Sequence, residues 1–145
     1  MNHADRERAI ALRVAIGLVA VFVALWIVRL FLGFATGSLT DQPGWVLDLV
    51  YGVGTIAFSA LILLVGWAIV TRQPRNAIGW LLMLIPILGI FAFVVGDYAT
   101  QALVTHTGSL PFGRVAAWFD RWLIVAALAI FIPLFLLFPD GKLPS

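Results

Sequence analysis

Four long apolar runs dominate the sequence and restrict what it can fold into. They cover residues 10–34, 46–70, 77–97 and 118–138. A helix needs about 20 mostly apolar residues to cross the hydrocarbon core of a bilayer, and each run is long enough. The sequence therefore predicts an all-α fold, an integral membrane four-helix bundle that forms a single transmembrane domain over residues 1–145.

The composition excludes several other classes of protein. Hydrophobic residues make up 63% of the chain and charged residues 11%, whereas a soluble domain carries about 25% charged residues. An ordinary soluble domain could not bury so much apolar surface. The nine Lys and Arg residues only slightly outnumber the seven Asp and Glu residues. They form no basic patch, so we expect no nucleic-acid partner.

The first apolar run has an alternative interpretation as a cleaved signal peptide. Its apolar stretch, residues 14–28, is long for that role, and a second stretch, residues 30–34, follows Arg29. We therefore interpret the run as a membrane span. The two longest connectors, residues 35–45 and 98–117, are too short to form a separate soluble domain.

The distribution of basic residues predicts the orientation, because Lys and Arg are enriched in cytoplasmic loops. If the N-terminus is cytoplasmic, six of them fall on the inner side: Arg6, Arg8, Arg13, Arg72, Arg75 and Lys142. Three fall on the outer side: Arg29, Arg114 and Arg121. We therefore expect a multi-pass protein of the plasma membrane with both termini in the cytoplasm.

Small residues recur at helical spacing in the first three runs. They line up in three sets: Gly17, Ala20 and Ala24; Gly52, Thr55, Ser59 and Gly66; and Gly89, Ala92 and Gly96. Lipid provides no hydrophobic drive between helices, so close packing needs small side chains, and we interpret these sets as packing faces. The alternative is that Gly and Ala are simply common in membrane helices. The fourth run has no such set, and we expect it at the periphery.

Prolines mark two further features of the chain. Pro86 and Pro133 lie inside the third and fourth runs and predict helix kinks, because proline removes a backbone donor and clashes with the preceding turn. Such a kink is either a hinge or static geometry.

Residues 71–76 predict a tight hairpin on the inner side. Pro74 would stop one helix and Asn76 would cap the next. Arg72 and Arg75 would then lie at the level of the lipid headgroups, which makes them candidate lipid contacts.

Three charged residues fall near the outer interface: Arg29, Asp48 and Asp97. Together they could form an ion pair or bind a polar ligand, but the pattern favours three separately solvated charges. Asp48 shares the small-residue face of its run, whereas Arg29 lies about 140° from the small face of the first run and could extend outward to the interface. The bilayer midplane has no nearby charge, which disfavours a proton-coupled transporter.

No set of residues in the chain suggests catalysis. There is no cysteine, and the two histidines, His3 and His106, fall on opposite sides of the membrane in this topology. They cannot share a metal ion, and no Ser-His-Asp set can be assembled from them. We therefore expect no enzyme activity, no metal and no cofactor.

Three segments, taken in order, carry a family resemblance. They are Arg72-Gln73-Pro74-Arg75-Asn76-Ala77-Ile78-Gly79-Trp80-Leu81-Leu82; then Tyr98-Ala99, Gly108-Ser109-Leu110-Pro111 and Ala116-Ala117-Trp118; and Leu137-Phe138-Pro139-Asp140-Gly141-Lys142-Leu143-Pro144-Ser145. Together they resemble the N-terminal multi-pass membrane region of a group of bacterial sensor histidine kinases. The resemblance covers residues 65–145, about half of the chain.

The resemblance implies a membrane sensing or anchoring region that precedes further spans and a cytoplasmic kinase unit. This sequence contains no phosphoacceptor helix and no ATP-binding domain, so we expect a sensory or anchoring module without kinase activity. The partners implied are the lipid bilayer and a kinase or other signalling domain, in cis or in trans, and a homodimer is left open. The alternatives are a stand-alone membrane protein that binds a partner protein, or a small transporter.

Overall fold

The computed structural model describes residues 3–35, 45–105 and 110–137. The elements within these ranges are α1 (His3–Ala35), α2 (Trp45–Arg72), α3 (Ala77–Thr100), the short π-helix η1 (Gln101–Thr105) and α4 (Gly113–Leu137). The four α-helices are long and apolar enough to cross a membrane. The predicted all-α four-helix fold of a multi-pass membrane protein is therefore confirmed.

The helices extend beyond the apolar runs that predicted them. α1 begins at His3 rather than at residue 10, and α4 begins at Gly113 rather than at residue 118. The first turns of α1 contain residues that favour helices, and Asp5 in the first turn interacts favourably with the helix dipole. Hydropathy marks the part of a helix that suits lipid, whereas backbone hydrogen bonding continues into the polar flanks.

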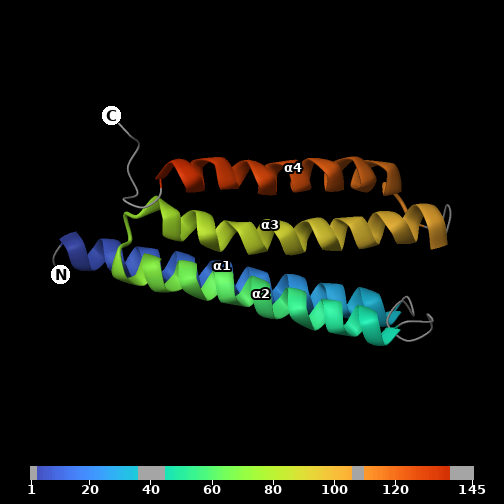
Figure 1. Cartoon of the computed structure of the whole chain (residues 1–145), viewed down its shortest axis with the longest axis horizontal. Helices are drawn as coiled ribbons and strands as arrows, with labels where there is room; N and C mark the ends of the chain where they lie inside the picture. Colours follow the sequence, from blue (N-terminus) through green and yellow to red (C-terminus); the bar gives the residue numbers. More distant parts are fainter. Residues whose placement is uncertain (1–2, 36–44, 106–109, 138–145) are drawn as a thin grey trace.

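Helix α3 lies at the centre of the fold. It contacts α1, α2 and α4, whereas α4 contacts only α3 and η1 in the described part of the chain. Figure 1 shows the resulting layers, with α4 on one side of α3 and the α1–α2 pair on the other. The peripheral position expected for the fourth span is therefore confirmed. α1 begins and α4 ends at the same end of the bundle (Figure 1).

The packing face of α1 differs from the predicted one. The buried residues of this helix are Ala11, Ala15, Phe22 and Trp26. The predicted set of Gly17, Ala20 and Ala24 is exposed, so the prediction is wrong for α1. The physical reason is area: two aromatic rings bury far more surface than two glycine or alanine positions, and Ala11 and Ala15 still let the backbones approach.

The contact between α2 and α3 is closest near the hairpin that joins them. A β-carbon added to Gly66 would lie 2.8 Å from the carbonyl oxygen of Gly79. The small-residue prediction therefore succeeds at Gly66. It is wrong at Gly52 and Gly89, where an added β-carbon would have no such neighbour within 4 Å.

The predicted hairpin between α2 and α3 is present. The backbone N–H of Gln73 donates to the carbonyl of Ile69 at 2.7 Å and closes the last turn of α2. Asn76 is the N-cap of α3, and its Oδ1 accepts the backbone N–H of Ile78 at 3.0 Å. Pro86 and Pro133 lie inside α3 and α4, where the kinks themselves remain predictions.

Candidate functional site

The first candidate site is an ion pair between α1 and α3. Arg29 donates from Nε to Oδ2 of Asp97 at 3.2 Å. The two side chains are partly shielded, at 27% exposure for Arg29 and 47% for Asp97. The structure therefore joins two of the three charged residues that the sequence placed at the outer interface.

Two aromatic rings surround the guanidinium group of Arg29. Its central carbon is 4.6 Å from the centre of the Phe93 ring and 5.3 Å from that of Trp26. A guanidinium at these distances is attracted by the electron-rich face of a ring. The cation is thus held by a carboxylate and two π-systems, which compensate for the water it loses at the interface between α1 and α3.

This geometry corrects two interpretations of the sequence. Arg29 follows the buried Trp26 by one helical turn, so it lies on the packed face of α1 and does not extend away from the bundle. Separate solvation, which the pattern favoured, is therefore wrong for Arg29 and Asp97. The backbone of Asp48 lies in the first turn of α2, but its side chain is outside the described residues, and its part in this cluster stays a prediction.

The neighbouring position on α3 faces α4. A β-carbon added to Gly96 would lie 3.2 Å from Oδ1 of Asp120. The Asp120 carboxylate therefore rests on the α3 backbone, one residue from Asp97. Among the described residues, no hydrogen bond or ion pair involves the Asp120 side chain.

A second ion pair lies at the opposite end of the bundle. Arg75, in the α2–α3 hairpin, donates from Nη2 to Oε1 of Glu7 in α1 at 2.8 Å. The hydrogen bond and the negative charge of Glu7 raise the pKa of the Arg75 guanidinium above its ordinary value. Arg75 and Arg72 are both exposed, as a contact with lipid headgroups requires.

Sequence reasoning singled out Arg75 but missed Glu7. The signal was the helical spacing of Glu7, Ala11 and Ala15, which recur every four residues and therefore share one face of α1. An acidic residue in line with two buried alanines points at the neighbouring element, where Arg75 is the basic residue at the same level.

The distance between the two ion pairs along α1 is close to the thickness of the hydrocarbon core of a bilayer. Glu7 and Arg29 are about 22 positions apart in α1, or about 33 Å at a rise of about 1.5 Å per residue. The hydrocarbon core of a bilayer is about 30 Å thick. The geometry can therefore place both pairs at the boundaries between lipid tails and headgroups, one in each leaflet.

The arrangement is suited to holding helices together and to binding charged groups at an interface. In the described ranges, no group of three or more His, Asp or Glu residues could hold a metal ion. The chain matches no protein-family model, no curated protein sequence and no solved structure. The likeness to membrane regions of sensor histidine kinases therefore stays a prediction.

Proposed function

We propose that the chain is a transmembrane input or anchoring module, which passes a change in helix packing to a signalling domain in cis or in trans. The resemblance of residues 65–145 to the membrane regions of sensor histidine kinases supports this function. The main structural support is the position of two consecutive residues in α3: Asp97 binds α1 through Arg29, and Gly96 packs against Asp120 of α4.

This adjacency provides a route from α1 through α3 to α4. A change that strengthens or breaks the Arg29–Asp97 pair acts directly on the turn of α3 that supports α4. Shifts of about 1–2 Å between packed helices are a common form of switching. An outer stimulus that contacts this pair would therefore move α4 relative to α1.

The weak attachment of α4 favours such a movement. Only 6% of its membrane-spanning window is buried, compared with 39% for α3 and η1. α4 has no described contact with α1 or α2 that would resist displacement. A segment that follows α4 in the chain would receive its movement directly. In the predicted orientation, the C-terminal end of α4 faces the cytoplasm, so a partner that contacts this end would be cytoplasmic.

The experiment measures the distance between α1 and α4 in nanodiscs. The chain has no cysteine, so the substitutions Leu12→Cys and Phe135→Cys introduce two unique sites for spin labels. Both positions are exposed. We expect Asp97→Asn to shift the label-to-label distance by about 2 Å. Arg121→Gln, which removes an exposed charge from α4, is the matched control and should leave the distance unchanged. An unchanged distance in Asp97→Asn would refute the proposed route.

A second candidate function is a stand-alone membrane protein that binds a partner helix. The exposed apolar surface of α4 favours it, with Leu128 at 62% exposure and Phe135 at 76%. Single-cysteine variants at these two positions would form crosslinked dimers in native membranes if the partner is a second copy. Crosslinks to a different protein would support a heteromeric complex. If only monomers are found, the exposed face of α4 contacts lipid and the second candidate function is refuted.

A further inference from the structure

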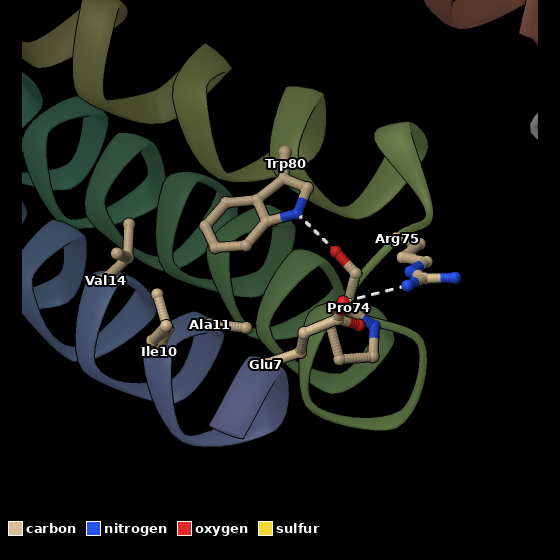
Figure 2. Close-up of a pocket in the computed structure, with 7 residues that line it drawn as sticks. All are labelled: Glu7, Ile10, Ala11, Val14, Pro74, Arg75 and Trp80. Carbon is tan, nitrogen blue, oxygen red and sulfur yellow. Dashed lines mark hydrogen bonds and ion pairs between the residues drawn. The ribbon is translucent and has the colours of Figure 1, made fainter. Parts of the chain in front are cut away.

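A groove opens between the first turns of α1 and the α2–α3 hairpin. Its volume is about 530 Å³, and Figure 2 shows the side chains that line it. Ile10 and Val14 of α1 and Trp80 of α3 form apolar walls, whereas Glu7 and Arg75 lie at the charged rim. The groove is therefore amphipathic, with a hydrocarbon-like interior and both signs of charge at one edge.

Trp80 contributes an apolar wall because its polar atom already has a partner. Its indole N–H donates to the carbonyl oxygen of Pro74 at 2.9 Å. Figure 2 shows the ring on the α3 side of the groove, facing Val14 and Ala11 of α1. The ring surface left to a ligand is therefore the carbon face, which suits an acyl chain.

The rim offers a cation and an anion to the same ligand. The Arg75 side chain is 85% exposed and uses one N–H on Glu7, and a guanidinium has several further donors suited to phosphate. The Glu7 side chain is 39% exposed, and a carboxylate accepts hydrogen bonds at more than one position on each oxygen.

In the predicted placement across the bilayer, the groove lies at the level of a lipid headgroup and the adjoining part of its acyl chains. Its rim lies about one hydrocarbon thickness from the Arg29–Asp97 pair, at the opposite interface. Val14 lies about 10 Å further along α1 than Glu7, so the apolar walls extend into the region of the lipid tails.

We propose that this groove binds one phospholipid whose headgroup carries both a phosphate and a primary ammonium, as in phosphatidylethanolamine. Arg75 binds the phosphate, Glu7 accepts hydrogen bonds from the ammonium, and an acyl chain lies along Ile10, Val14 and Trp80. A headgroup with only negative charge would bind Arg75 but be repelled by Glu7. A quaternary ammonium would match the charges but has no N–H to donate. This site does not depend on the proposed signalling function.

Native mass spectrometry of the full chain in detergent tests the proposal. The probes are phosphatidylethanolamine, phosphatidylcholine and phosphatidylglycerol with identical acyl chains. We expect the apparent affinity for phosphatidylethanolamine to exceed that for each of the others by roughly tenfold, the effect of one charge-assisted hydrogen bond. Glu7→Ala, which removes the acceptor, should abolish the preference over phosphatidylcholine, and Arg75→Gln should weaken binding of both zwitterionic lipids.

Two further variants separate lipid binding from a loss of folding. Arg29→Gln breaks the distant ion pair and should leave lipid binding unchanged. Val14→Trp fills the groove without changing a charge and should lower the affinity for phosphatidylethanolamine. The proposal is overturned if phosphatidylglycerol binds best, if the two zwitterionic lipids bind equally to the unaltered chain, or if Arg29→Gln weakens binding as much as Arg75→Gln.

Discussion

Asp120 of α4 lies so close to Gly96 of α3 that a β-carbon at position 96 would be 3.2 Å from its Oδ1. The next residue, Asp97, binds Arg29 of α1. One turn of α3 thus contacts α4 on one side and α1 on another. This turn is one of the places where α4 approaches the rest of the bundle closely, together with Gly113, where an added β-carbon would lie 2.7 Å from the β-carbon of Ala102.

The first prediction concerns the size of the residue at position 96. We expect Gly96→Leu to push α4 away from α3 and to lower the free energy of unfolding by about 1–3 kcal/mol, the usual cost of overpacking. Gly89→Leu is the matched control on the same helix, because an added β-carbon there meets no neighbour within 4 Å. Reversible unfolding in mixed micelles measures both variants. Equal losses at positions 96 and 89 would contradict the close α3–α4 contact.

The second prediction concerns the pair between Arg29 and Asp97. Its strength should fall between that of an exposed pair and that of a buried pair, because both side chains are partly shielded. We expect a double-mutant cycle with Arg29→Gln and Asp97→Asn to give a coupling free energy of about 1 kcal/mol.

The rings near Arg29 supply the control for this cycle. Exchanging the two charges, with Arg29→Asp and Asp97→Arg together, restores an ion pair but moves the cation away from its place between Trp26 and Phe93. We therefore expect only partial recovery of stability. Full recovery would show that the rings contribute nothing, and zero coupling in the cycle would show that the charges act separately.

The α2–α3 contact gives a third prediction, in which one substitution has different effects at two sites. Gly66→Ala should lower stability by about 1–3 kcal/mol, because its β-carbon would meet the Gly79 carbonyl oxygen at 2.8 Å and backbone cannot easily move. Gly54→Ala should be neutral or stabilising, since the site is open and alanine is the better helix former. The two unfolding curves are compared in the same detergent, and a loss at position 54 equal to that at 66 would refute the close approach.

The fourth prediction concerns the pH dependence of the Glu7–Arg75 pair. Glu7 raises the pKa of Arg75, so any stability gained is fully present below the pKa of the unfolded chain and is lost only as pH rises through the still higher folded value. We therefore expect the NMR signals of the Arg75 guanidinium to stay constant from about pH 7 to about pH 10. In Arg75→Lys combined with Glu7→Gln, the amine has no Glu7 charge beside it and an ordinary pKa of about 10.4, so its signals should begin to shift at the top of this range. Movement of the Arg75 signals in this range would contradict the raised pKa.

The sequence predicted the helices well because their lipid-spanning parts are defined by composition and length alone. It did not predict how α1 is rotated about its axis. In α1 the small-residue rule selected the face of Gly17, whereas Phe22 and Trp26 determine the packed face. Because the wrong face of α1 was taken as the packed one, Arg29 was also predicted to extend away from the bundle.

The candidate sites show the same limit. The rise along a helix placed Arg29 and Asp97 at the same depth, but depth alone does not select a partner among several charges. The hairpin was predictable because Pro74 and Asn76 act locally. The Glu7–Arg75 contact was not, because it joins segments far apart in the chain.

The last prediction concerns orientation across the membrane. Charge bias predicts that the end of the bundle with the α2–α3 hairpin is cytoplasmic, since Lys and Arg are retained there during insertion. Reporter fusions after Arg75 should therefore be active only as cytoplasmic reporters, and fusions after Gln42 or Gly108 only as exported ones. Replacing Arg72 and Arg75 by Gln should weaken this preference, whereas Arg114→Gln, on the predicted outer side, should strengthen it. The reverse pattern would place both ends of the chain outside and move the proposed lipid groove to the outer leaflet.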